Sequence, residues 1–297
     1  MSKTADVEDG EPDLGTDRDE DPIADILTHG DPIRSLTEHL TAIVDETKVR
    51  LDDDGLHVSH VDPANVCMLD VTAPAAGFER FEVTEETSIG LNLDTFETAI
   101  QWARKGRGDD DGDPVTIEVY DDPTRIRVSV TRPDRGMKRF SEWFGLDPET
   151  LREEPNIPEL DLRNRADPSP KGLKAGVQSL DENHRYALVT REAESFVLSS
   201  QEGYETDLDP DDDVGVADTV YYGDTAWSAS DGTGESDVSL FSLDYLKDVT
   251  KALDSSKADR VTVCWGNEFP VQFRFENEDW GHEGVWMLAP RIQKEES

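Results

Sequence analysis

Apolar residues recur along this chain at two spacings, the three-to-four-residue period of a helix and the alternation of a strand. The helical period follows four signals that favour a helix start. These signals are Asp31-Pro32, Asp94 with Glu97 three residues on, Ser169-Pro170, and Ser242. We therefore predict four amphipathic helices, of which the last covers 242–254.

Strand-like runs fill the intervals around these helices. In the first half of the chain they cover 48–51, 56–61, 66–71, 78–83, 88–91, 115–120, 125–131 and 135–144. In the second half they cover 186–190, 195–199, 204–208, 214–216, 218–222, 260–265, 271–275 and 285–288. Turn residues separate the runs, beginning with Asp53-Asp54-Gly55, so we expect antiparallel sheets.

The order helix, strands, helix, strands occurs twice, with an offset of about 140 residues between the two copies. This internal repeat predicts an α+β fold of two similar domains, each with two helices packed on antiparallel sheets. We place the domains at 31–145 and 163–292, joined by a proline-bearing connector at 146–162. Residues 1–30 are expected to be a disordered acidic tail, and 293–297 a short C-terminal tail.

The chain is strongly acidic: 68 Asp and Glu residues against 29 Lys and Arg give a net charge of −39. Such a charge is typical of a disordered chain or of a folded protein from a high-salt cytoplasm. The persistent apolar periodicity favours the folded, halophilic protein, because at 1 M salt the Debye length is only about 3 Å.

Cysteine usage and hydropathy indicate the compartment. Cys67 and Cys264 lie in strand-like runs without a spacing motif, which is typical of free thiols in a reducing cytoplasm. No apolar segment approaches the roughly 20 residues of a membrane span. We expect a soluble cytoplasmic protein with no membrane contact.

Enzymatic motifs are missing from the sequence. There is no glycine-rich phosphate loop, no Cys-x-x-Cys and no His-x-x-x-His motif. The acidic runs at 109–111 and 209–213 lack the glycine and the closing glutamate of an EF-hand loop. We therefore predict no catalytic residue, no cofactor and no metal site, and we look for function in binding.

Several short segments resemble DNA sliding clamps of the proliferating cell nuclear antigen family. They are Ser-Leu-Asp-Tyr-Leu-Lys at 242–247, Gly-Asn-Glu-Phe-Pro-Val at 266–271, Leu-Ala-Pro-Arg-Ile at 288–292, Val-Asp-Pro-Ala-Asn-Val at 61–66, Gly-Leu-Asn-Leu at 90–93 and Ile-Pro-Glu-Leu-Asp-Leu at 157–162. The resemblance covers roughly 32–292 and implies a homotrimeric ring around duplex DNA. The implied partners are a clamp loader, DNA polymerase and other replication and repair proteins, which the clamp tethers as a processivity factor.

Three sets of site residues follow from this resemblance. The implied pocket for partner peptides comprises Val61, Asn65, Val66, Met68, Ile157, Pro158, Pro270, Met287, Ala289 and Pro290. Asn65 stands where the family often has histidine, and Met287 where it often has an aromatic residue. The implied DNA-facing residues, on or near the predicted helices, are Arg34, Arg104, Lys105, Arg107, Lys171, Lys174, Lys247 and Lys251.

The implied subunit interface pairs the strand at 137–144 of one copy with 204–209 of the next. Its members are Lys138, Arg139 and Trp143 on one edge, with Glu205, Asp207 and Asp209 on the other. The opposite charges of the two edges favour this pairing.

Two other hypotheses remain open at this point. One is an acidic adaptor or checkpoint-type paralogue that has the clamp fold and never encircles DNA. The other is a metal-dependent hydrolase built on the aspartate runs. Apparent mass in high salt separates the ring from a monomeric adaptor, and the hydrolase requires turnover that depends on divalent cations.

Overall fold

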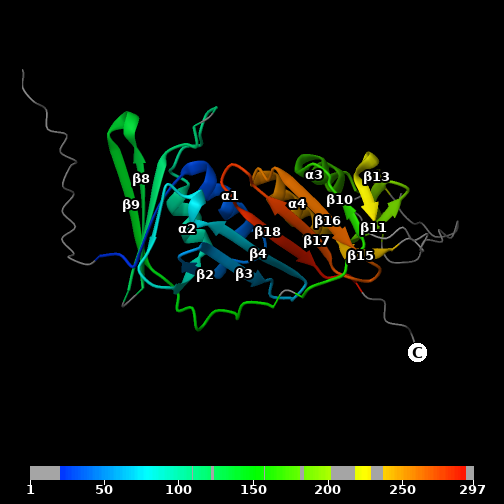
Figure 1. Cartoon of the computed structure of the whole chain (residues 1–297), viewed down its shortest axis with the longest axis horizontal. Coiled ribbons are helices and arrows are strands. Elements are labelled where there is room, and N and C mark those ends of the chain that lie inside the picture. Colours follow the sequence, from blue (N-terminus) through cyan, green and yellow to red (C-terminus); the bar gives the residue numbers. More distant parts are fainter. Residues whose placement is uncertain are drawn as a thin grey trace, which may run out of the picture.

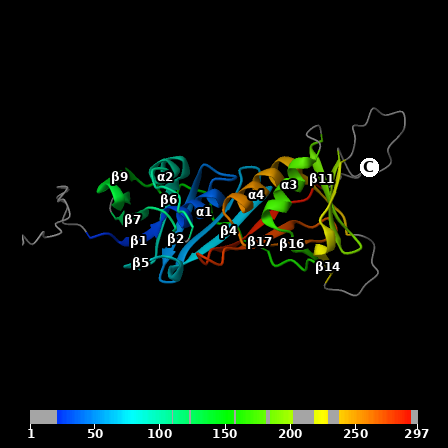
Figure 2. The same cartoon turned by 90° about the horizontal axis from the view of Figure 1, so that it is seen from above.

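The computed structural model describes residues 21–108, 110–121, 124–156, 158–180, 184–201, 218–228 and 237–291. These residues form an elongated molecule in which antiparallel strands build three sheets (Figure 1). The four α-helices follow one another along the molecule in the order α2, α1, α4, α3 (Figure 2). The predicted α+β fold with two helices in each of two similar domains is confirmed.

The N-terminal repeat contains a five-stranded and a four-stranded unit. The first has the order β5 (Arg80–Val83), β1 (Ala24–His29), β7 (Pro114–Tyr120), β8 (Arg125–Arg132) and β9 (Met137–Phe144). The second has the order β4 (Cys67–Pro74), β3 (Gly55–Val61), β2 (Glu46–Asp52) and β6 (Thr87–Asn92). The helices of this repeat are α1 (Gly30–Leu40) and α2 (Leu93–Ile100).

The C-terminal repeat has the same five-plus-four arrangement. Its five strands are β14 (Ala226–Ser228), β10 (Asn164–Ala166), β16 (Arg260–Trp265), β17 (Val271–Glu276) and β18 (Glu283–Leu288). Its four strands are β13 (Thr219–Tyr221), β12 (Ser195–Gln201), β11 (Tyr186–Glu192) and β15 (Ser239–Ser242). Its helices are α3 (Pro170–Ser179) and α4 (Leu243–Ser255).

The two repeats join through β18 and β4, which pair antiparallel and fuse their units into one nine-stranded sheet. Polar contacts between the repeats add to this junction. The Ser35 hydroxyl of α1 donates to the Ser256 carbonyl behind α4 at 2.7 Å, and the Trp286 indole of β18 donates to Nδ1 of His39 at 3.2 Å. The junction therefore fixes the repeats as one continuous layer.

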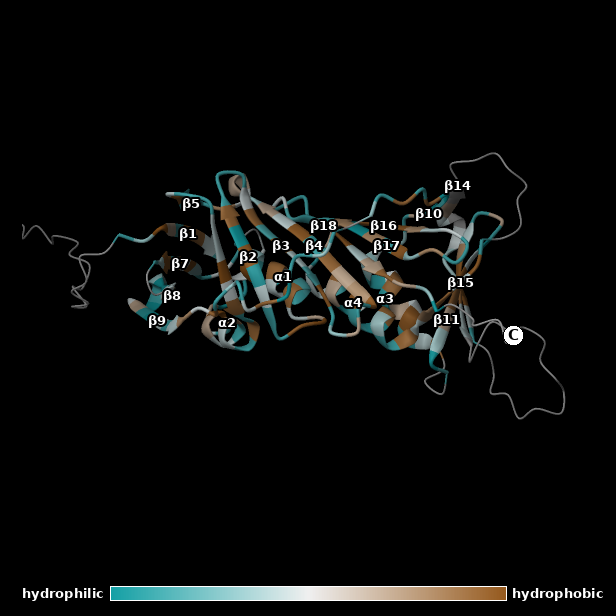
Figure 3. Ribbon diagram, turned by 90° about the horizontal axis from the view of Figure 1, so that it is seen from below, coloured by the Kyte–Doolittle hydropathy of each residue, from teal (hydrophilic) through white to brown (hydrophobic). Residues whose placement is uncertain are grey.

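Strand alternation decides which side chains enter the core. In β4, Cys67, Leu69 and Val71 are almost completely buried, while Met68 and Asp70 between them are only partly buried. The same alternation of apolar and polar positions runs along the strands of Figure 3. The helices cover the inward-facing apolar rows, so the opposite face of the sheet stays open to partners.

Strand β1 corrects the predicted boundary of the N-terminal tail. Ala24–His29 were assigned to disorder, yet they form a strand that pairs with both β5 and β7. Ala24 and Ile26 are 0% and 1% exposed, so this short alternation lies in the core despite its acidic surroundings. The N-terminal repeat starts at β1, and residues 1–20 of the predicted tail lie outside the described part of the chain.

The four helices form where predicted, but two of their starts differ. Helix α1 begins two residues earlier than predicted, after His29, and Asp31 instead pairs with Lys257 at 2.8 Å. Helix α2 is capped by Asn92, whose side chain accepts from the Thr95 amide, rather than by a box from Asp94. The amide oxygen of Asn92, two residues before Asp94, accepts from one of the orphan donors in the first turn.

The cap of α3 was predicted correctly. Its Ser169 hydroxyl accepts from the Gly172 amide at 3.2 Å, and Pro170 occupies the first turn. Ser242 precedes α4 as expected, although its side chain makes no capping hydrogen bond.

Besides β1, three strands were not predicted, because each is too short to show a clear alternation: β10, β14 and β15. The predicted strands at 204–208 and 214–216 lie outside the described residues. The connector residues 146–156 and 158–162 form neither helix nor named strand, and the connector crosses the molecule along one side of the sheets (Figure 1). Among the described helices, none is long and apolar enough to cross a membrane.

Candidate DNA-facing and partner-binding surfaces

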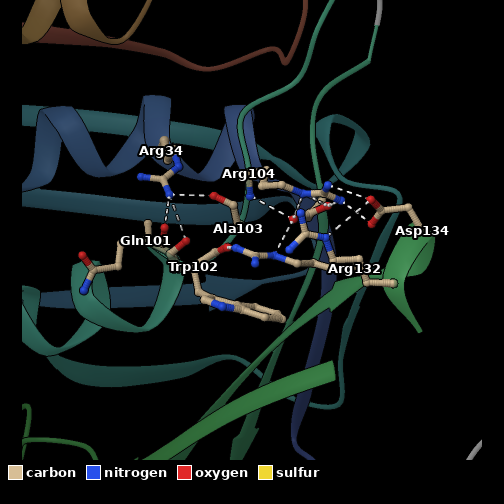
Figure 4. Close-up of polar contacts among 10 residues, drawn as sticks. Arg34, Gln101, Trp102, Ala103, Arg104, Arg132 and Asp134 are labelled. Atoms are coloured by element: carbon tan, nitrogen blue, oxygen red, sulfur yellow. Dashed lines mark hydrogen bonds and ion pairs between the residues drawn. The ribbon is translucent and has the colours of Figure 1, made fainter. Parts of the chain in front are cut away.

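Arg34, predicted to face DNA, is used instead to cap a neighbouring helix. Its guanidinium donates to the carbonyl oxygens of Ile100, Gln101 and Ala103 at 3.2, 2.8 and 2.8 Å (Figure 4). These carbonyls lie at the C-terminus of α2, where a cation offsets the negative end of the helix dipole. Arg34 therefore holds α1 and α2 together.

Arg104 is also bonded to other residues of the chain. Its guanidinium spans two carboxylates, with Nη2 at 2.7 Å from Oδ1 of both Asp113 and Asp134 (Figure 4). The hydrogen bonds to Asp113, and then those to Asp134, raise the pKa of Arg104. The same bonds from Arg104 lower the pKa of Asp113, whose side chain is only 5% exposed.

A second arginine completes this network. Arg132 approaches Asp113 at 3.4 Å, donates to the Trp102 carbonyl at 2.5 Å and stacks over the Trp102 ring at 3.8 Å. Two guanidinium groups thus converge on one buried carboxylate, which fixes the segment after α2 against the β8–β9 turn.

The remaining predicted DNA-facing residues differ in whether their charged groups already pair with another residue of the chain. Lys174 of α3 pairs with Asp254 of α4 at 2.7 Å. The others form neither hydrogen bond nor ion pair with any described residue: Lys105 and Arg107 after α2, Lys171 on α3, and Lys247 and Lys251 on α4. The free basic side chains on helices therefore belong to α3 and α4.

The loop between β3 and β4, part of the predicted partner pocket, is organised by Asp62. Asp62 is 3% exposed, and its carboxylate accepts from the amides of Val66 and Cys67 at 2.7 Å and of Ala64 at 2.9 Å. The Tyr245 hydroxyl on α4 donates to Oδ2 of Asp62 at 2.5 Å. These bonds to the charged form lower the pKa of Asp62 against the opposing effect of its burial.

Tyr245 was missed as a site residue because only the fold brings α4 beneath this loop. Burial first, and then its hydrogen bond to Asp62, raise the pKa of the Tyr245 hydroxyl, which remains a donor. Asn65, at the tip of the loop, has a φ of 57°, a left-handed conformation that asparagine tolerates. The loop therefore has a defined shape.

The apolar wall of the pocket lies where β3, β4 and β18 run side by side. Met68 is opposite Met287 on one side and Val61 on the other. The Ala289 amide donates to the Val66 carbonyl at 2.8 Å, which brings the C-terminal segment against the loop.

Proline residues and an unpredicted aromatic complete the pocket surroundings. Pro270 and Pro290 are partly buried, and Pro158 is exposed on the connector; Ile157 lies outside the described residues. Phe269, beside Pro270, is 50% exposed. The sequence analysis did not select Phe269, although a large apolar residue in a predicted turn suggests an exposed binding residue.

A groove of about 640 Å³ continues from this wall beneath the connector. Pro158 and Leu160 line one side of it, and the outward-facing side chains of β4, β17 and β18 form its floor. Of the predicted pocket residues, Pro158 lines this groove, and Met68 and Met287 lie two residues along β4 and β18 from the groove residues Asp70 and Val285.

The predicted subunit edge is exposed, but its character is more apolar than expected. Strand β9 ends the five-stranded sheet, and its Phe140 and Phe144 are 47% and 67% exposed. Lys138 and Arg139 are exposed as well, whereas Trp143 packs partly against the core.

The opposite edge ends in β13, where Tyr221 is 56% exposed. The predicted partner residues Glu205, Asp207 and Asp209 lie outside the described part of the chain. Among the described residues, β13 is one edge strand of that sheet and β15 is the other, and β13 carries no charged side chain from Thr219 to Tyr221.

Within the described ranges, no group of three or more His, Cys, Asp or Glu side chains is placed to hold a metal ion. Asp109 and the acidic run at 209–213 fall outside those ranges. The surfaces described above are a row of helices, a groove beside the connector and the edge strands β9 and β13.

Comparisons with known proteins agree with this arrangement. The family model for "Proliferating cell nuclear antigen, N-terminal domain" matches residues 26–139. The DNA polymerase sliding clamp of Natronomonas pharaonis is 31% identical over 271 residues, which cover 91% of this chain and 98% of that protein. The sliding clamp of Haloarcula marismortui is 30% identical over 269 residues, with 91% and 98% covered.

Solved structures share the fold over almost the whole chain. The structure titled "C-terminal region of FEN-1 bound to A. fulgidus PCNA" superposes with a TM-score of 0.71 at 24% identity, covering 92% of this chain and all of that chain. The clamp from Thermococcus kodakaraensis gives a TM-score of 0.72 at 18% identity, covering 90% and 100%.

Proposed function

Because the chain belongs to the family of DNA polymerase sliding clamps, we propose that it acts in the cytoplasm as a processivity factor without catalysis of its own. Three copies close into a ring around duplex DNA, and the ring tethers DNA polymerase and other replication and repair proteins. The observation that carries this proposal is the repeated strand order, because a single chain leaves one of its two sheet junctions open.

The strand pairing that joins the two repeats within one chain shows how two chains could join. Within the chain, β18 ends a five-stranded unit and pairs with β4, which begins a four-stranded unit. In the other half of the repeat, β9 and β13 hold the equivalent places, and among the described residues no strand pairs with the outer edge of either. Pairing β9 of one copy with β13 of the next reproduces the closed junction head to tail, and a heterologous contact of this kind generates a ring.

Exposed aromatic side chains make this contact apolar. Phe140, Phe144 and Tyr221 would leave water when the edges meet, and apolar burial withstands the salt that screens surface ion pairs. Backbone hydrogen bonds between the two edges set the register.

Light scattering after size exclusion in molar KCl tests the ring. The wild type should have the mass of three chains, and Phe144→Asp should shift it toward one chain. Phe269→Asp is the matched control, because Phe269 is a half-exposed aromatic on neither edge strand. A wild type with the mass of a single chain at every salt concentration contradicts the ring and favours an adaptor.

Client proteins dock, we propose, in the pocket between the β3–β4 loop, the C-terminal segment and the connector. A peptide with one aliphatic and two aromatic anchors places them against Met68, Val66 and Pro290, and the small apolar contact dominates the binding energy. A solved structure with the same fold has the C-terminal region of FEN-1 bound. Pro290→Asp should abolish stimulation of the polymerase while the ring stays assembled, and undiminished stimulation places docking elsewhere.

Duplex DNA passes along the row of helices, which face the centre of the ring in this proposal. Only Lys171, Lys247 and Lys251 on α3 and α4 offer unpaired cationic side chains there among the described helices. With a net charge of −39 per chain, direct affinity is low and retention is topological, so a clamp loader must place the ring on DNA. Few phosphate contacts also imply a shallow dependence of binding on salt.

A further inference from the structure

The connector carries a single basic residue, Arg152, and that residue touches the wall of the partner pocket. Residues 146–162 otherwise contain several Asp and Glu residues. Arg152 Nη1 donates to the carbonyl oxygens of Asp62 at 2.5 Å and Val61 at 3.4 Å, and Nη2 lies 3.5 Å from that of Pro63. Its guanidinium thus lies on the backbone of the loop that shapes the pocket.

The loop is a firm anchor for this contact because it is held from its other side. The buried Asp62 carboxylate accepts three backbone amides of the loop together with the Tyr245 hydroxyl of α4. Arg152 and Tyr245 therefore contact one residue through different groups, the former through its backbone oxygen and the latter through its side chain. The position of the connector is linked in this way to the nine-stranded sheet and to α4.

The groove beneath the connector carries charges of both signs. Asp70, Glu276 and Glu283 line it together with Arg274, and Glu159 of the connector lies on its rim. Charge interactions across such an open groove are screened in molar salt, whereas the Arg152 guanidinium holds the connector through hydrogen bonds to backbone carbonyls.

We propose that Arg152 is a positioning residue that latches the connector beside the pocket before a client peptide arrives. This inference rests on the docking site proposed above. In the latched protein the connector side of the pocket is formed in advance, so the peptide binds without first having to order that segment.

Loss of the latch should weaken peptide binding mainly through association. Arg152→Ala should raise the dissociation constant about tenfold, equivalent to about 1.4 kcal/mol. The association rate should carry most of the change, because the apolar contacts that slow dissociation are untouched. Arg152→Lys keeps a donor without the fork of the guanidinium and should lose about threefold.

The experiment uses the full-length clamp and a fluorescent synthetic peptide with one Ile and two Phe anchors, followed by stopped-flow anisotropy in molar KCl. Arg163→Ala is the matched control: it removes the same charge close by, from an exposed arginine with no hydrogen bond or ion pair to any described residue. Hydrogen exchange of residues 146–162 without peptide should accelerate in Arg152→Ala and stay unchanged in Arg163→Ala.

The outcomes separate the latch from the docking site. If the wild type binds the peptide and Arg152→Ala binds it as fast and as tightly as Arg163→Ala does, the latch is wrong. Unchanged hydrogen exchange in Arg152→Ala overturns the contact itself. If the wild type does not bind the peptide at all, the docking proposal fails, while the exchange measurement still decides whether Arg152 restrains the connector.

Discussion

His39 should make the junction between the two repeats sensitive to acid. It lies near the end of α1, is 1% exposed, and accepts a hydrogen bond from the Trp286 indole at 3.2 Å. Its ring stacks on Phe275 with centroids 4.0 Å apart. Burial first, and then repulsion from His282, lower the pKa of His39 from 6.5 to about 3.

The sign and size of the effect follow from proton binding. The folded pKa lies below the unfolded value, so between these two values the unfolded chain binds a proton that the folded chain refuses. Stability is therefore complete above pH 6.5 and falls as the pH drops toward the folded pKa. At pH 5, about 1.5 pH units below the unfolded pKa, His39 alone should cost roughly 2 kcal/mol.

Unfolding by guanidinium chloride at pH 8 and pH 5 in molar KCl measures this loss of unfolding free energy. His39→Gln retains an oxygen that can accept from Trp286 but does not titrate, so its loss of stability between the two pH values should be smaller than that of the wild type by about 2 kcal/mol. His60→Gln should reduce the loss by a similar amount, because burial lowers the pKa of His60 to about 4. If His39→Gln and the wild type lose equal stability, the reasoning is refuted.

Two further predictions concern buried carboxylates. Asp113→Asn leaves Arg104 and Arg132 without their shared anion and should cost about 2 kcal/mol of unfolding free energy, measured by chemical denaturation; an unchanged midpoint contradicts the structural role assigned to Arg104. Tyr245→Phe removes one donor to the Asp62 carboxylate and should cost about 1 kcal/mol and speed hydrogen exchange in the β3–β4 loop, as measured by mass spectrometry; equal exchange in variant and wild type contradicts the anchoring of that loop.

Much of the fold could be predicted from local pattern. Ser169 and Pro170 predicted the start of helix α3, and strict alternation predicted β4. Both signals are readable because helix caps and apolar periodicity depend on residues that are close in sequence. Strand β1 was predicted to be disordered, because a short strand within an acidic stretch has the composition of a disordered tail. Its membership in the core depends on β5 and β7, which are distant in sequence.

The site residues also differ in whether local sequence or only the fold reveals their contacts. The pocket segments on β3, β4 and β18 lie side by side because these strands pair, and their role in binding partner peptides stays a prediction. The roles of Arg34 and Arg104 could not be read from the sequence, since an arginine on or near a helix looks the same whether it contacts phosphate, a helix terminus or a buried carboxylate. Arg152 and Tyr245 become visible only when the connector and α4 are placed against one loop.

Retention on DNA tests the central claim most directly. The clamp, loaded with its loader onto nicked circular DNA, should remain bound through gel filtration and should be released when a restriction enzyme linearises the circle, because a ring with few phosphate contacts can slide off an end. Replacing Lys171, Lys247 and Lys251 by Glu should reduce loading without dissolving the trimer. Equal retention on circular and linear DNA contradicts encirclement.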